Sequence, residues 1–163
     1  MNTTVKTLAL LIGLLIVPYA AGARIDAILV DKSEGRLYLK SKGQVVKAYH
    51  VVFGANPEGH KQQEGDERTP EGLYVLDYKN AASGYYKSIH ISYPNKRDRQ
   101  LAKWRGVNPG GAVMIHGQKN GWGWLGFLTQ FFNWTNGCIA LKDADMEEVW
   151  QAVKVGTPIQ IQP

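Results

Sequence analysis

Short runs of alternating hydrophobic and polar residues extend through most of the chain. This period of two is typical of β-strands with one buried face. The runs, rich in β-branched and aromatic residues, are IDAILVD, RLYLKS, QVVKAYHVVFG, LYVLDY, SIHISY, AVMIHG and TPIQIQP. Lys42-Gly43 predicts a turn between the second and third runs, which would make the first three a meander. The pattern predicts a mainly β fold.

The period changes to that of a helix only near the C-terminus. Apolar residues recur there at the spacing of one helical face, at Met146, Val149, Trp150 and Val153. Asp143 is expected to cap this helix, because its carboxylate can accept backbone N–H bonds of the first turn. A shorter helix is expected around residues 99–104, and the charged loop before the fourth run, residues 56–72, is expected not to pack internally.

Residues 1–23 have a different pattern. Lys6 precedes an apolar run at residues 8–17, Pro18 ends the run, and Ala21-Gly22-Ala23 follows. This is the layout of a secretory signal peptide, and the run is shorter than the roughly 20 residues that a spanning helix needs. We predict a cleaved signal at 1–23, one domain over 24–163, and export to the periplasm or cell envelope without a stable membrane span. An uncleaved anchor is the alternative.

Composition narrows the possible partners. The formal net charge of the chain is +5, which falls to +4 once Lys6 leaves with the signal. A modest positive balance suits an anionic surface such as cell wall or headgroups. The cations are scattered and no nucleic-acid motif is present, so nucleic acid is not expected as a partner. We expect a monomer.

Cys138 is the only cysteine of the chain, so no internal disulfide can form. Such a thiol forms an intermolecular disulfide, is buried and inert, or is a reactive group. An unpaired thiol is a liability in an oxidising compartment, so its presence there indicates a specific role. His116 stands 22 residues earlier, at the end of a predicted buried strand. An imidazole there could take the thiol proton, and a cleft thiolate should react with iodoacetamide well below the usual pH.

The residues around the thiol favour catalysis over metal binding. Gly137 permits a tight turn, from which backbone N–H groups could face an oxyanion. The four histidines and one cysteine show no metal-ligand spacing, so no metal is expected.

Four sequence blocks place the two residues in a known context. They are RTPEGLY (68–74), ISYPN (91–95), GVNPGGAVMIHG (106–117) and WTNGCIAL (134–141). In this order and spacing they resemble the YkuD-type L,D-transpeptidase catalytic domain, and the resemblance covers about residues 25–163. It implies a mainly β L,D-transpeptidase-type sandwich with one C-terminal helix and a short aromatic helix or lid, and no cofactor.

The resemblance also implies an activity in cell-wall biogenesis and cell shape. Such enzymes attack the carbonyl of the third residue of a peptidoglycan stem tetrapeptide, release the terminal D-alanine and pass the resulting thioester to an amine or to water. By position, Cys138 is the nucleophile, His116 its proton acceptor, and Gly137 and Cys138 the oxyanion donors. The residues expected to contact substrate are Asn136, Gly117, Arg68, Trp134, His90 and Thr135.

Two positions depart from the common family signature. Asn136 stands where a histidine is usual, and Ala140 stands where an arginine follows the cysteine by two residues. The missing arginine removes an expected partner for a substrate carboxylate. One of Arg68, Arg97, Arg99 and Arg105 is expected to replace it.

Several alternatives remain open. The same site could serve an L,D-carboxypeptidase or an amidase that releases an attached protein, or the domain could be a catalytically silent wall-binding module. The aromatic residues of 122–134 are interpreted first as a short amphipathic helix, roughly Leu125 to Phe132, that packs on the core. They could instead form a lid over the cleft or make shallow membrane contact.

Overall fold

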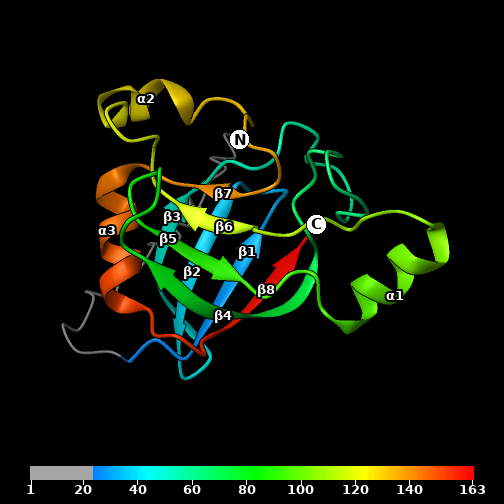
Figure 1. The fold of residues 1–163 in the computed structure, drawn as a ribbon. Helices are drawn as coiled ribbons and strands as arrows, with labels where there is room; N and C mark the ends of the chain where they lie inside the picture. The colour runs from blue at the N-terminus through cyan, green and yellow to red at the C-terminus, as the bar shows by residue number, and fades with distance from the viewer. Residues whose placement is uncertain (1–23) are drawn as a thin grey trace, which may run out of the picture.

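The structure of this chain is a computed structural model that describes residues 24–163 (Figure 1). Eight strands form one sheet in the order β3-β2-β1-β8-β4-β5-β6-β7. Their bounds are β1 Ala27–Asp31, β2 Arg36–Ser41, β3 Gln44–His50, β4 Gly72–Asn80, β5 Ser88–Ile91, β6 Met114–His116, β7 Ile139–Ala140 and β8 Pro158–Gln162. The predicted mainly β sandwich fold is confirmed, as a single curled sheet with few helices. The predicted signal peptide, residues 1–23, lies outside the described residues.

The first three strands form the predicted meander. β1 pairs antiparallel with β2, and β2 pairs antiparallel with β3. Lys42 and Gly43 join β2 to β3 with φ values of 50° and 78°, the positive values that a tight hairpin turn requires. Leu37 and Leu39 of β2 point into the core because successive side chains of a strand face opposite sides of the sheet.

The last strand of the chain, β8, lies in the middle of the sheet. It runs parallel to β1 and antiparallel to β4. Through this strand the N-terminal meander is joined to the half-sheet β4–β5–β6–β7, which carries the cysteine and histidine. Ile159 and Ile161 of β8 are buried in the same core as the strands on either side.

The C-terminal helix is present as α3, Asp143–Ala152, and buries Met146 and Val149 against the sheet. The predicted cap is wrong, because Lys142 occupies the capping position and no side chain caps the helix. Asp143 is the first helical residue, and its Oδ1 accepts the backbone N–H of Gln118 at 2.7 Å instead. The carboxylate ties the loop after β6 to the helix, which no local pattern could indicate.

The short helix predicted at residues 99–104 is α1, Lys96–Arg105, and begins three residues earlier than expected. Asn95 and Asp98 form a capping box at its start, which accounts for the earlier beginning. Asp98 is buried, accepts the hydroxyl of Tyr74 at 3.0 Å and lies 3.2 Å from His60 Nε2. This contact holds His60 half-buried against the helix.

The aromatic region after β6 forms a short 3₁₀ turn, η1 (Gly123–Leu125), and a single α-helical turn, α2 (Gly126–Thr129). Figure 1 shows α2 at the rim of the molecule, beyond β7 and α3. The prediction that its aromatic residues pack on the core is wrong, because these side chains are exposed. Within residues 24–163 no helix has the length and apolar character that crossing a membrane demands.

Candidate active site

The histidine ends one strand, and the cysteine directly precedes the parallel strand next to it. β6 ends at His116, and β7 begins directly after Cys138. The register pairs Ile115 with Ile139 and His116 with Ala140. Because paired residues of parallel strands point to the same face and alternate residues share it, His116 and Cys138 face the same side of the sheet.

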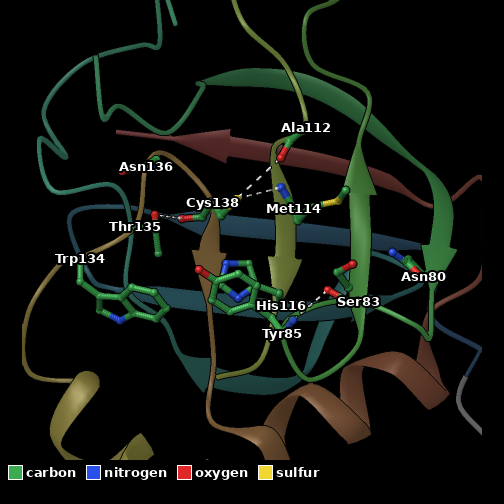
Figure 2. A pocket seen from close by; sticks show the side chains of 11 residues that line it. Asn80, Ser83, Tyr85, Ala112, Met114, His116, Trp134, Thr135, Asn136 and Cys138 are labelled. Carbon is green, nitrogen blue, oxygen red and sulfur yellow. Dashed lines mark hydrogen bonds between the residues drawn. The ribbon is translucent and has the colours of Figure 1, made fainter. Parts of the chain in front are cut away.

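On that side the structure has a cavity of about 360 Å³, which Figure 2 shows from close by. Both Cys138 and His116 line it. The complete lining is Asn80, Ser83, Tyr85, Ser88, Ala112, Met114, His116, Trp134, Thr135, Asn136 and Cys138. No lysine, arginine, aspartate or glutamate is among these residues, so most of the polar groups that the cavity presents are uncharged.

His116 is held as a neutral base. Its side chain is buried, and Nδ1 lies 2.6 Å from the carbonyl oxygen of Gly117. A carbonyl can only accept, so Nδ1 carries the proton and Nε2 keeps its lone pair. Tyr85 packs on the ring with centroids 4.4 Å apart, and Trp134 meets it edge-on at 6.0 Å. Burial lowers the pKa of His116, with the Gly117 carbonyl opposing, so the imidazole is unprotonated near neutral pH.

Cys138 is held as a neutral thiol. Its Sγ lies 3.8 Å from the carbonyl oxygen of Ala112, an S–H donor contact, and accepts the backbone N–H of Met114 at 3.4 Å. Burial raises the pKa of the thiol, while the Met114 N–H and the charge of Lys61 lower it to a smaller extent. The sequence-based expectation of a thiolate stable well below the usual pH is corrected by this direction. The resting pair is thiol and imidazole.

The turn before the sulfur, Thr135–Cys138, is organised by one hydroxyl. Thr135 Oγ1 accepts the N–H of Gly137 at 3.1 Å and donates to the carbonyl of Cys138 at 2.7 Å. Gly137 was expected to offer its N–H to an oxyanion, but that group is already engaged by Thr135. Of the two predicted donors, the N–H of Cys138 is the one that this turn leaves for a substrate.

Glycine is required at position 137 for two reasons. Its φ is 117°, in the region that other residues rarely adopt. A Cβ there would also lie 2.5 Å from the carbonyl oxygen of Arg68. Gly54 makes a similar approach, since its Cβ would lie 1.9 Å from the carbonyl oxygen of Glu67. The loop at residues 67–68 therefore packs backbone to backbone against Gly54 and against the Thr135–Cys138 turn.

The other predicted substrate contacts divide into two groups. Trp134, Thr135 and Asn136 line the cavity with Cys138 and His116. Gly117, Arg68 and His90 are not among the lining residues. Gly117 acts through its carbonyl on His116, whereas Arg68 acts through its backbone behind Gly137.

His90 is engaged away from the cavity. Its Nδ1 lies 2.6 Å from the carboxylate of Asp77, and its ring stacks on Tyr78 with centroids 4.6 Å apart. The arginines proposed to replace the missing one are also elsewhere, because Arg97, Arg99 and Arg105 belong to α1 and none lines the cavity. No arginine side chain lines the cavity of Cys138 and His116.

The sequence reasoning missed two residues that shape the site. Tyr85 packs on the catalytic candidate His116 and lines the cavity. Lys61 is buried, and its Nζ donates to Asp66 Oδ1 at 2.7 Å and lies 3.8 Å from where a Cβ on Gly137 would be. The loop that carries Lys61 was expected to be too charged to pack internally, but Lys61 and Thr69 are both buried. The neighbouring RTPEGLY block was the only feature of the sequence that indicated this loop as part of the site.

Residues 24–163 contain no cluster of three or more histidine, cysteine, aspartate or glutamate side chains arranged to hold a metal ion.

Comparison with known proteins decides the family. Residues 25–161 match the domain described as YkuD, the L,D-transpeptidase catalytic domain. The chain belongs to the YkuD L,D-transpeptidase family. A protein of Escherichia coli K12, YafK, provisionally named an L,D-transpeptidase, is 30% identical over 121 residues, which are 72% of this chain and 42% of YafK.

Solved structures agree with this assignment. The helical cell shape determining protein Pgp2 of Campylobacter jejuni superposes with a TM-score of 0.61 at 26% identity, over 85% of this chain and 47% of Pgp2. The L,D-transpeptidase of Enterococcus faecium shares the fold with a TM-score of 0.55 at 16% identity, over 85% of this chain and 49% of the other. This YkuD chain spans less than half the length of each of these relatives.

The fold explains why this YkuD domain carries alanine two residues after the cysteine. Ala140 is fully buried, and its backbone pairs with Val52. The side-chain amide of Gln130 lies 3.4 Å from the Ala140 carbonyl and is itself buried. An arginine side chain at position 140 would have to displace these neighbours. Local packing therefore accounts for alanine at this position instead of the arginine of the common family signature.

Proposed function

We propose that this protein is an exported, peptidoglycan-modifying cysteine L,D-transpeptidase, which acts on stem tetrapeptides through a thioester on Cys138 and releases the terminal D-alanine. The observation that carries the proposal is the shared cavity of Cys138 and His116, with the imidazole held neutral by the Gly117 carbonyl. Membership of the YkuD family supplies the reaction class.

The first step makes a bond to sulfur. As Sγ of Cys138 attacks the carbonyl carbon of the third stem residue, its proton passes to Nε2 of His116, the nitrogen that the Gly117 contact leaves free. The carbonyl π electrons move to oxygen, and the N–H of Cys138 faces that oxyanion. The Met114 N–H stabilises the negative charge that develops on sulfur. Because both groups start neutral, proton transfer accompanies attack rather than preceding it.

The second step breaks the peptide bond. The oxyanion collapses, the C–N bond to D-alanine breaks, and the His116 imidazolium returns its proton to the leaving amine. The acyl group is then a thioester on Cys138. An incoming amine, or water, gives a proton to His116 and attacks the thioester, and the departing sulfur is reprotonated. An amine acceptor completes transpeptidation, and water completes hydrolysis.

The compartment belongs to the same proposal. The reaction requires access to peptidoglycan, and the signal-like residues 1–23 would direct the domain to the periplasm or envelope. The cavity lining of neutral polar and aromatic residues suits an extended peptide held through backbone groups and aromatic contact. Asn136 and Trp134 are the proposed substrate contacts at its edge.

The experiment uses residues 24–163 with purified disaccharide tetrapeptides, with and without an added amine acceptor, and mass spectrometry of the products. Release of D-alanine is expected, with cross-linked or amine-exchanged product when the acceptor is present. Cys138→Ala should abolish release while circular dichroism and the unfolding midpoint stay close to those of the parent chain.

The outcomes separate the alternatives. Hydrolysed tripeptide alone, whatever the acceptor, would make the protein an L,D-carboxypeptidase. Cleavage of a wall-linked protein amide without action on tetrapeptides would make it an amidase. Binding to wall without any product from the parent chain would leave a silent module, and activity retained by Cys138→Ala would reject the nucleophile.

A further inference from the structure

In the aromatic segment, residues 122–132, the large apolar side chains face solvent instead of the core. Large apolar side chains normally face the core of a globular domain. Here six of them are exposed, and Trp124 and Phe131 reach exposed fractions of 71% and 82%. The six are Trp122, Trp124, Phe127, Leu128, Phe131 and Phe132.

The polar side chains of the same stretch face inward. Thr129 Oγ1 donates to the buried side chain of Gln118 at 2.6 Å. Gln130 is buried, and its carbonyl accepts from His50 Nε2 at 2.8 Å. On the other side Gly123 lies against the Asp143 carboxylate, because a Cβ there would lie 2.2 Å from Oδ2. The segment is therefore anchored through polar groups in the orientation that presents its aromatic side chains outward.

The exposed side chains of the aromatic segment lie outside the main surface cavities of residues 24–163. Four surface cavities of the described chain, the one at Cys138 included, are lined by no residue of 122–132. Figure 1 shows the segment projecting at the rim of the molecule, past β7. A contiguous apolar patch on a soluble domain marks a contact surface. A patch that borders none of these cavities fits a deformable partner better than a peptide or a glycan chain, which would bind in a groove.

Charge identifies that partner as anionic. From Gln118 to Leu141 the sequence contains no aspartate or glutamate, and the exposed lysines Lys119 and Lys142 stand at the two ends of this stretch. The next acidic residue along the chain, Asp143, turns its carboxylate inward to the Gln118 N–H. Tryptophan and phenylalanine flanked by lysine are the composition of membrane-interface anchors, where rings sit at headgroup level and cations meet anionic lipid.

We propose that the aromatic segment is a docking surface for an anionic lipid bilayer. Trp122, Trp124, Phe127, Leu128, Phe131 and Phe132 enter the interface, and Lys119 and Lys142 contact the headgroups. Trp134, which follows the segment, lines the Cys138 cavity. Docking therefore holds the cavity beside the membrane surface. The inference is independent of the proposed catalytic reaction.

The test measures co-sedimentation with vesicles of phosphatidylethanolamine and phosphatidylglycerol. Residues 24–163 are used because they hold the whole sheet and its core, and because the apolar run of 8–17 would bind lipid by itself. The double variant Trp124→Ala/Phe131→Ala should lower partitioning by about tenfold or more, given the apolar area removed from each side chain. Trp104→Ala, which removes an equally exposed tryptophan from α1, should leave partitioning unchanged.

A second arm tests the lysines. Lys119→Glu/Lys142→Glu should weaken binding to these vesicles, since about 1 kcal/mol per cation, or several-fold in partitioning, is lost near an anionic surface. Lys103→Glu/Arg105→Glu on α1, which reverses two exposed cations, is the matched control. Vesicles of phosphatidylcholine alone should bind the parent chain more weakly, and added salt should reduce binding to the anionic vesicles only.

Four results would overturn the proposal. They are absence of vesicle binding by the parent chain, equal loss in Trp104→Ala and the double variant, a dimer in sedimentation velocity that the double variant breaks without any lipid binding, and retention on purified sacculi that the double variant loses while vesicle binding is absent. The third result would assign the surface to a second copy. The fourth would assign it to the wall.

Discussion

The Thr135–Cys138 turn and the aromatic segment, residues 122–132, are separated by only two residues of chain, yet their groups are arranged in opposite ways. The polar groups of the turn are bonded within the fold, whereas the apolar side chains of the segment face solvent. In the turn, Thr135 satisfies both the Gly137 N–H and the Cys138 carbonyl, and the Arg68 backbone closes the space behind it. In the segment, the apolar side chains are turned to the outside. A catalytic thiol, as proposed for Cys138, must be held in one geometry. Side chains that only contact a partner surface need no fixed geometry but must be exposed to solvent.

The difference predicts where substitutions are costly. Around Cys138, changes should alter catalysis or unfold the domain, because each atom there has a fixed neighbour. Around Phe131, changes should leave both untouched and act only on an external contact. Four predictions test this contrast, from the largest expected effect to the smallest.

The largest effect is expected at His116. His116→Gln keeps a polar side chain but removes the proton acceptor, and should lower kcat by about 10²–10⁴-fold, the contribution usual for general acid–base catalysis. His90→Gln is the matched control, because His90 is also a strand histidine but bonds Asp77 outside the cavity. Steady-state D-alanine release measures both. Equal losses in the two variants would contradict the assignment of His116.

The next effect is on stability. Gly137→Ala should lower the free energy of unfolding by about 2–5 kcal/mol, because overpacking and an unfavourable backbone conformation each cost roughly 1–3 kcal/mol. Urea denaturation of residues 24–163 provides the measurement. Gly84→Ala is the control, since Gly84 has no positive φ and nothing lies within 4 Å of its added Cβ. A Gly137→Ala chain as stable as the control would contradict the tight approach of Arg68.

A smaller effect is expected at Lys61. Burial holds the pKa of Cys138 above its ordinary value of 9.0, so alkylation by iodoacetamide should keep accelerating as pH rises past that value. Lys61→Met removes the positive charge that opposes the shift, so the pKa should rise further and alkylation near neutral pH should slow. Lys61→Arg should restore much of the rate, and Lys47→Met, which breaks an exposed ion pair with Glu148, should not change it.

A merely structural role for Lys61 predicts a different result. The unfolding free energy would then fall while the pH profile of alkylation stayed in place. A shift of the profile toward lower pH in Lys61→Met would contradict the electrostatic account outright.

The smallest effect is expected in the aromatic segment. Trp124→Ala and Phe131→Ala should each change the unfolding free energy by less than about 0.5 kcal/mol, as surface substitutions usually do. Thr129→Val, which removes the inward hydrogen bond to Gln118, should cost about 0.5–1.5 kcal/mol. If the aromatic substitutions prove more destabilising than Thr129→Val, the segment is part of the core after all.

The sequence predicted the regular elements better than the contacts between them. Alternation found the strands, and helical spacing at Met146 and Val149 found α3. The prediction that Asp143 caps α3 was wrong, because its carboxylate accepts the backbone N–H of Gln118, a partner 25 positions away, instead of an N–H of the helix. The aromatic helix failed because amphipathic spacing shows that a segment has an apolar side and not which way that side faces.

The site was predicted to a similar extent. Four blocks in a fixed order identified Cys138 and His116 as partners, and the structure places both on one cavity. His90 and the four candidate arginines are not among its lining residues, whereas Tyr85 and the buried Lys61 were missed. The protonation state of the pair was also out of reach, because it depends on how completely the fold excludes water from both groups.

By itself the sequence determined the mainly β architecture, the family and the two candidate residues, Cys138 and His116, because periodicity, order and spacing are properties of the chain alone. Only the tertiary structure decided that the pair rests neutral, that the Gly137 N–H is already engaged and that the aromatic side chains face outward. Which groups are buried, which acceptor a given N–H bonds and which way an apolar face points all depend on contacts between segments distant in the chain. No local sequence pattern encodes these contacts.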